Sequence, residues 1–133
     1  MKTREKILVA ESEPIIALDI EHQLAEWGFE HSEIALSRSE VPALVKRKKP
    51  NLLIMDNDHR DGNRDIQSAV ELNRKYNLSV ILIIDWMTEE LKQAMEGLKS
   101  FYTIPKPFDR NELHRLIEEA LQDKRKTKKM KAA

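Results

Sequence analysis

The feature that most constrains this chain is an alternation of short apolar runs with longer amphipathic stretches, repeated five times along 133 residues. The apolar runs are residues 6–10, 32–36, 52–55, 79–85 and 101–104. Three of them are apolar on both faces, which is typical of central parallel strands covered by helices on each side. Parallel strands that alternate with helices need right-handed crossovers. The sequence therefore predicts one α/β domain built from five strand–helix units.

Local chemistry marks the ends of the predicted helices. Pro14 suits a first helical turn, and Gly28 suits a left-handed stop after it. Residues 37–40, Ser-Arg-Ser-Glu, match a capping box. We expect helices from Pro14 to Trp27, from the capping box to Pro50, near 64–76, from Thr88 to about Leu98, and from Asp109 to about Leu121.

The net charge of zero conceals an uneven distribution. Six of the 23 Lys and Arg residues lie in 124–131, so the rest of the chain holds 17 basic against 23 acidic residues. We expect residues 1–123 to form the domain and 124–133 to be a frayed or disordered basic tail. A weak contact with nucleic acid, a membrane or a protein partner is the alternative. No aromatic residue is interleaved with the basic ones, so direct nucleic-acid binding is not expected.

Several classes of protein are excluded by what the sequence lacks. The chain has no cysteine, which excludes disulfides and thiolate metal sites. No apolar run approaches the roughly 20 residues that a membrane-spanning helix needs, and the start is too short in its apolar part for a secretory signal. We therefore expect no membrane span and a cytoplasmic location.

Charged residues follow the predicted strands at the end where parallel strands meet. Glu11 and Ser12 follow the first strand, Asp56 and Asp58 the third, and Lys106 the fifth. Reactive groups in such sheets gather at the carboxyl ends of the strands. Paired acids attract a hard cation such as magnesium, and an ionised aspartate can attack phosphorus while a lysine offsets the charge on the transferring oxygens. The constellation indicates phosphoryl transfer.

Over about residues 5–123 the chain resembles the receiver domains of two-component response regulators. The residues that carry the resemblance are ILVAESEP near the start, PNLLIMD ending at Asp56, and IPKPFDRNEL around Lys106. The resemblance implies a doubly wound, flavodoxin-like (βα)5 fold with a five-stranded parallel sheet of order 2-1-3-4-5. It also implies a signalling module and not an enzyme.

The resemblance further implies a role for each site residue. Asp56 would accept a phosphoryl group from a histidine kinase or a phosphotransfer protein, and Lys106 would contact the phosphoryl oxygens. Magnesium would lie beside Glu11, Asp56 and the backbone carbonyl of Asp58. In this family the peptide bond before the proline that follows the lysine, here Pro107, is commonly cis.

Three family positions are changed in this chain. Ser12 stands where a second acid normally binds the metal, so it is a weak candidate ligand and magnesium should bind weakly. Ile84 stands where a Thr or Ser normally donates a hydrogen bond to the phosphoryl group. Thr103 stands at the position of the switch aromatic, and the neighbouring Tyr102 should face the opposite side of the sheet.

We expect the output to pass through a downstream protein partner or a weak homodimer, because no further domain is expected after residue 123. In the family the fourth helix, fifth strand and fifth helix commonly form the contact surface, here within residues 88–121. This surface carries charges of both signs, and surface ion pairs contribute little, so a stable dimer is not predicted. Trp86 either packs or lines a partner surface.

Two alternatives from other classes remain open. A pseudo-receiver would keep the fold and bind partners without phosphorylation, which the changes at Ser12, Ile84 and Thr103 favour. Haloacid-dehalogenase-type phosphohydrolases also begin with an apolar strand that ends in Asp-x-Asp. Here that strand is the third, the usual Thr or Val after the pair is missing, and the chain lacks room for a cap, so this alternative is remote.

Overall fold

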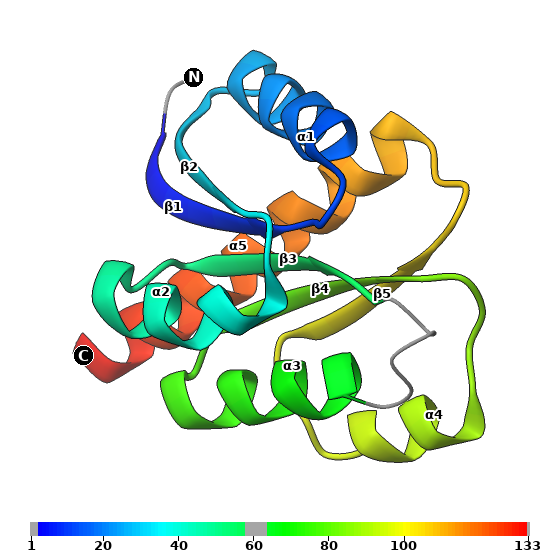
Figure 1. The fold of residues 1–133 in the computed structure, drawn as a ribbon. Coiled ribbons are helices and arrows are strands. Elements are labelled where there is room, and N and C mark those ends of the chain that lie inside the picture. Colours follow the sequence, from blue (N-terminus) through cyan, green and yellow to red (C-terminus); the bar gives the residue numbers. More distant parts are fainter. Residues whose placement is uncertain (1–2, 58–63, 133) are drawn as a thin grey trace.

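Five parallel strands form a single sheet in the order β2-β1-β3-β4-β5 (Figure 1). This is a computed structural model, which describes the backbone of residues 3–57 and 64–132 and the side chains of 4–57 and 64–125. The strands are β1 (Thr3–Ala10), β2 (Phe29–Ala35), β3 (Leu52–Asp56), β4 (Ser79–Ile84) and β5 (Phe101–Pro105). The strand order and direction confirm the predicted flavodoxin-like fold.

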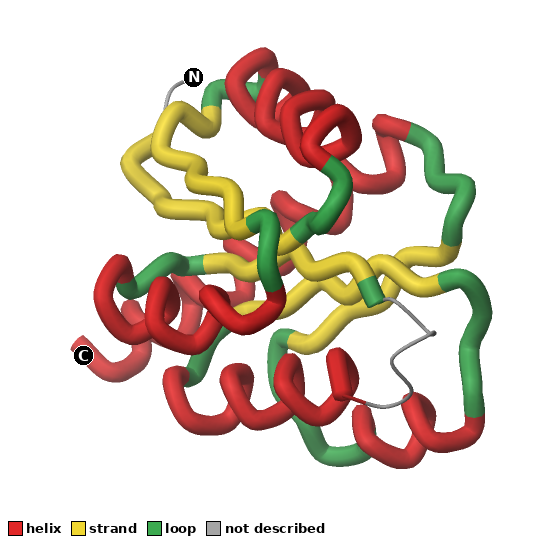
Figure 2. Tube along the Cα trace, viewed as in Figure 1, coloured by secondary structure: helices red, strands yellow, loops and turns green. Residues whose placement is uncertain are grey.

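Helices cover both faces of the sheet (Figures 1 and 2). One face is covered by α1 (Pro14–Glu26) and α5 (Arg110–Ala132). The other is covered by α2 (Val41–Lys48), α3 (Arg64–Tyr76) and α4 (Glu89–Met95), with a short 3-10 turn, η1 (Arg38–Glu40), before α2. Among these described helices, none combines the length and the apolar character needed to cross a membrane.

Two apolar clusters hold these layers together. Alternate residues of a strand point to opposite faces, so Leu82 and Ile84 of β4 pack with α2, α3 and α4, while Ile83 packs with α1 and α5. All six residues of β4 are buried. This two-sided burial is why the central strands are apolar at every position, and it places their carboxyl ends in the middle of one edge of the domain.

The predicted helix boundaries are confirmed where local chemistry sets them. The hydroxyl oxygen of Thr88 accepts a hydrogen bond of 3.1 Å from the backbone N–H of Leu91, and residues 37–40 form the expected capping box. Gly28, after α1, has a φ of 95°, which an L side chain rarely adopts. Capping chemistry is local, and it can be deduced from neighbouring residues.

Other boundaries differ from the prediction because they depend on distant parts of the chain. β2 begins at Phe29 and not at residue 32, because its whole length pairs with β1. α4 ends at Met95, and Leu98 lies beyond Gly97, whose φ is 77°. The burial of α1 also differs from the prediction, because its apolar residues Ile15 and Leu18 are exposed.

The basic segment continues α5 as helix through Ala132, where the sequence predicts a frayed or disordered tail. Lys and Arg are good helix formers, and no Gly or Pro interrupts the segment. Two contacts hold its first residues: the Arg125 guanidinium pairs with Glu5, and Lys124 Nζ donates to the carbonyl of Asn77. The boundary of the domain near residue 123 stays a prediction.

Candidate functional site

The carboxyl ends of three strands bring Glu11, Asp56 and Lys106 together. Asp56 is the last residue of β3, and Lys106 directly follows β5. Lys106 Nζ lies 2.7 Å from Oδ1 of Asp56, and both side chains are partly exposed. Backbone hydrogen bonds of 2.8 Å fix the chain at these ends, from Asn57 N–H to the Ile83 carbonyl and from Lys106 N–H to the Ile84 carbonyl. The Lys106–Pro107 peptide bond is cis.

Lys106 remains a cation in this setting. A second carboxylate, that of Asp85, lies 3.7 Å from its Nζ. Partial burial lowers the pKa of Lys106, but the hydrogen bond and charge of Asp56 and the charges of Asp85 and Glu11 outweigh it and raise the pKa above its ordinary value. The ammonium is thus available to stabilise negative charge on any group that Asp56 carries.

Glu11 is the buried acid of the site, with only 4% of the residue exposed. Its Oε1 accepts a 3.2 Å hydrogen bond from the backbone N–H of Glu13. Burial raises the pKa of Glu11 to about 7, and the hydrogen bond and charge of Asp56 add to the rise, against the opposing effects of Glu13 N–H and Lys106. Once Glu11 is ionised, above about pH 7, its carboxylate and that of Asp56 repel each other, and a cation placed between them would relieve that repulsion.

This pair of acids partly fits a magnesium ion. Glu11 and Asp56 supply charged oxygens, whereas Ser12 is exposed and offers only a hydroxyl. Asp58, whose carbonyl is a predicted ligand, lies outside the described residues. Within 3–57 and 64–132 no group of three or more His, Cys, Asp or Glu side chains could hold a metal. A bound magnesium would supply positive charge for transferring oxygens, and the ligand set predicts that it is held weakly.

The two residues at the predicted switch positions, Ile84 and Thr103, are both described by the structure. Ile84 is fully buried and carries no hydrogen-bond donor. Thr103 is half-buried. Tyr102 packs in the cluster with α1 and α5, on the face opposite to Ile84, and its hydroxyl bonds a carboxylate oxygen of Asp123 in α5. Tyr102 therefore does not replace the aromatic side chain that position 103 lacks.

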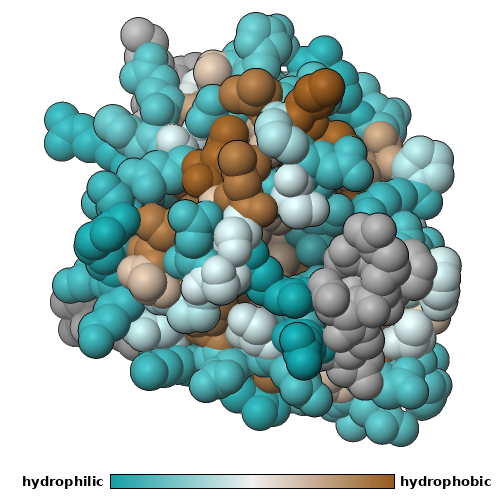
Figure 3. Space-filling view, viewed as in Figure 1, coloured by the Kyte–Doolittle hydropathy of each residue, from teal (hydrophilic) through white to brown (hydrophobic). Residues whose placement is uncertain are grey.

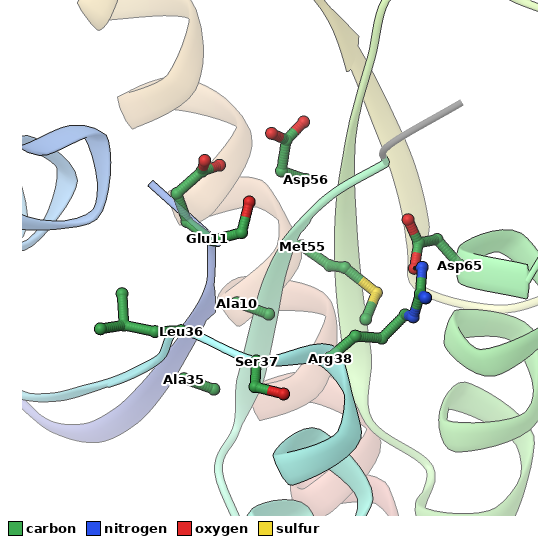
Figure 4. A pocket seen from close by; sticks show the side chains of 10 residues that line it. Ala10, Glu11, Ala35, Leu36, Ser37, Arg38, Met55, Asp56 and Asp65 are labelled. Carbon is green, nitrogen blue, oxygen red and sulfur yellow. Dashed lines mark hydrogen bonds and ion pairs between the residues drawn. The ribbon is translucent and has the colours of Figure 1, made fainter. Parts of the chain in front are cut away.

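A cavity of about 280 Å³ adjoins Asp56 (Figure 4). Besides Glu11, Ser12 and Asp56, its walls include Arg38 and Asp65, which the sequence does not single out. Arg38 Nη1 lies 2.8 Å from Oδ1 of Asp65, and Asp65 is 3% exposed. The two residues are 27 positions apart in the sequence, so no local pattern could reveal the pair.

Large apolar side chains are exposed near this edge of the domain. Trp86 and Met87, just after β4, are 59% and 46% exposed, which excludes a fully packed role for Trp86. The others among the described residues are Ile15, Ile16, Leu18 and Leu36. The space-filling view shows apolar side chains gathered over the upper half of one face (Figure 3). Apolar surface of this kind is typical of a contact with another protein.

Comparison with known proteins gives two curated relatives, although no family model matches the chain. The Phyllosphere-induced regulator PhyR of Methylorubrum extorquens is 28% identical over 117 residues, which cover 87% of this chain and 43% of that protein. The transcriptional regulatory protein PdtaR of Mycobacterium tuberculosis is 29% identical over 118 residues, covering 87% and 56%. The chain thus spans about half the length of the curated relatives it matches.

A solved structure agrees with these relatives. The response regulator PhyR from Brucella abortus superimposes with a TM-score of 0.75 at 26% identity, covering 96% of this chain and 51% of that one. The superposition therefore covers nearly the whole βα repeat of this chain. In its motifs, its strand order and its relatives, the chain is similar to the receiver domains of response regulators.

Proposed function

We propose that this chain is a receiver domain of the two-component response regulators and a phosphoacceptor, which takes a phosphoryl group onto Asp56 from a histidine kinase or a phosphotransfer protein. The observation that carries the proposal is the 2.7 Å contact between Lys106 and Asp56 beside the buried Glu11. The contact places a carboxylate nucleophile beside an ammonium group. This cation can stabilise the negative charge of the phosphoryl oxygens during transfer and in the phosphorylated product.

The transfer is a displacement at phosphorus. An oxygen of Asp56 forms a bond to phosphorus while the bond from phosphorus to the donor's leaving group breaks, and that electron pair departs with the leaving group. Lys106 would stabilise the phosphoryl oxygens throughout. Glu11 and Asp56 would together hold a magnesium ion. Ser12, which is exposed and offers only a hydroxyl, would contribute little to its binding. Because Ser12 stands in place of a second acid, we expect phosphorylation to depend less on magnesium than it would with two adjacent acids.

The test is incubation with acetyl phosphate and magnesium, followed by measurement of the intact mass. The wild type should gain one labile phosphoryl group, and Asp56→Asn should gain none while keeping its fold. Asp85→Asn is the matched control, because Asp85 also faces Lys106 but follows the neighbouring strand β4. Labelling that persists in Asp56→Asn would move the acceptor to another residue.

A pseudo-receiver is the second candidate, favoured by the buried, donor-free Ile84 at the position that normally contacts the phosphoryl group. Such a domain would bind its partner without a covalent change. It predicts no labelling of the wild type, together with partner binding that Asp56→Asn leaves unchanged.

We propose that the output passes through a protein partner. The relatives are named as regulators, and each continues beyond the part that this chain matches. The surface within residues 88–121 and the exposed apolar residues near the site are the candidate contacts. A homodimer through 88–121 would be weak, because its charges are exposed and of both signs.

A further inference from the structure

Arg38 brings a second cation to the cavity beside Asp56. It opens η1, three residues after the end of β2, and its side chain extends along the cavity to Asp65 at the start of α3 (Figure 4). Asp65 is buried, whereas 33% of the Arg38 side chain is exposed. In the sheet, β2 lies on one side of β3 and β5 lies on the other. Arg38 and Lys106 therefore come from strand ends on opposite sides of β3, and Arg38 lines the same cavity as Asp56.

The backbone that carries Arg38 is held in place. Ser37 N–H donates to Oε2 of Glu40 at 3.3 Å, and Glu40 N–H donates to the Ser37 carbonyl at 3.1 Å. The first bond belongs to the capping box of η1, and the second closes its turn through the backbone. The guanidinium can therefore change partners by rotation of its own side chain, without a rearrangement of the turn.

A phosphoryl group on Asp56 would need hydrogen-bond donors, and Ile84, at the position where the family normally has a Thr or Ser, does not supply one. The phosphoryl group carries a charge of about −1.5 to −2 and three acceptor oxygens, compared with a single charge on the aspartate. Ile84 has no hydrogen-bond donor in its side chain. On the β5 side, Lys106 would therefore be the side chain that binds the phosphoryl oxygens. A guanidinium binds phosphoryl oxygens in a planar, two-pronged geometry, and Arg38 lines the same cavity as Asp56.

We propose that Arg38 is a phosphoryl-binding residue, which exchanges its ion pair with Asp65 for one with phosphorylated Asp56. This inference rests on the proposed function and specifies how the modified site is recognised. The phosphoryl group carries more charge than the carboxylate of Asp65, so it competes for the guanidinium. The exchange would report phosphorylation to η1 and the start of α3, in place of the hydroxyl and aromatic pair that Ile84 and Thr103 cannot form.

The test measures the affinity for beryllofluoride, a phosphoryl mimic, in the presence of magnesium by calorimetry. Arg38→Gln should weaken binding about tenfold, the loss expected for a charge-assisted hydrogen bond. Asp65→Asn should strengthen it, because it releases Arg38 from its competitor. Arg110→Gln is the matched control: it removes an exposed ion pair with Glu26, neither residue lines the cavity, and the affinity should be unchanged.

The opposite signs of the first two variants separate the proposal from a structural role. A clamp that merely held the cavity together would make Arg38→Gln and Asp65→Asn weaken binding alike, and that result overturns the proposal. So does an unchanged affinity in Arg38→Gln. If this variant unfolds because the buried Asp65 loses its ion pair with Arg38, the double variant Arg38→Gln/Asp65→Asn takes its place and should also bind about tenfold more weakly than wild type.

The outcome also distinguishes this inference from the proposed function. A wild type that is labelled at Asp56 but shows no dependence on Arg38 overturns the inference alone. A wild type that neither binds beryllofluoride nor accepts a phosphoryl group overturns both. In a supporting result, the Nε–H resonance of Arg38 also shifts when beryllofluoride binds, and that of Arg110 does not.

Discussion

Replacing Glu11 by Gln should stabilise the metal-free protein, although it removes a proposed magnesium ligand. The pKa of Glu11 rises from 4.5 to about 7 on folding, because the carboxyl is buried beside Asp56. The folded state therefore holds the proton more tightly than the unfolded state does. The stability from this proton is complete below pH 4.5 and is lost as the pH rises to about 7.

The magnitude follows from the size of this shift. At about 1.4 kcal/mol per pH unit, ionised Glu11 lowers the free energy of unfolding by about 3 kcal/mol at pH 8 and by less than about 1 kcal/mol at pH 5. Gln has a similar shape and no charge, so Glu11→Gln should recover these amounts relative to the wild type.

Urea unfolding at pH 5 and pH 8, with a chelator and at constant ionic strength, measures both differences. Glu13→Gln is the matched control, since Glu13 is exposed and only two residues away, and its effect should be small at both values. A gain for Glu11→Gln that is equal at pH 5 and pH 8, or a loss at pH 8, would refute the reasoning, because the effect would then not come from the ionised carboxylate.

Three further predictions concern the binding of magnesium, the predicted switch position Ile84 and the buried hydrogen bonds of Asn73. Magnesium affinity should rise between pH 6 and pH 8, because the proton of Glu11, with its pKa of about 7, must leave before the metal binds; a flat calorimetric profile would contradict this. Ile84→Thr should accelerate labelling by acetyl phosphate by adding a donor, and should lower the free energy of unfolding by roughly 1–3 kcal/mol because it buries a hydroxyl; an unchanged labelling rate would argue against a role for this position. Asn73→Ala should cost roughly 1–3 kcal/mol, since Asn73 Nδ2 donates to the carbonyls of Leu78 and Lys99; a wild-type urea midpoint would count against that account.

Much of the fold could be predicted because its strongest signals are local. The two-sided apolar runs that became β3 and β4 predicted central strands, and Thr88 marked a helix start with its own side chain. The start of β2 could not be read in the same way, since an edge strand is defined by pairing with β1 as much as by its own residues. The orientation of α1 likewise depends on tertiary packing, which leaves Ile15 83% exposed.

The residues of the candidate site also fall into two groups: those that the sequence could predict and those that depend on tertiary packing. Glu11, Asp56 and Lys106 could be grouped from the sequence, because parallel strands deliver their carboxyl ends to one edge. Arg38 and Asp65 could not, because they come from a turn and a helix whose meeting depends on how α3 lies against η1. Asn73 was missed for a similar reason: its two bonds join the end of α3 to the segments that precede β4 and β5.

The central claim is that the carboxylate of Asp56 itself becomes phosphorylated. Borohydride reduces an aspartyl phosphate to the alcohol, so treatment of the acetyl phosphate-labelled protein followed by peptide mass analysis locates the acceptor directly. We predict homoserine at position 56 and aspartate at position 85. Reduction at another position, or none in a folded protein incubated with donor and magnesium, would contradict the account.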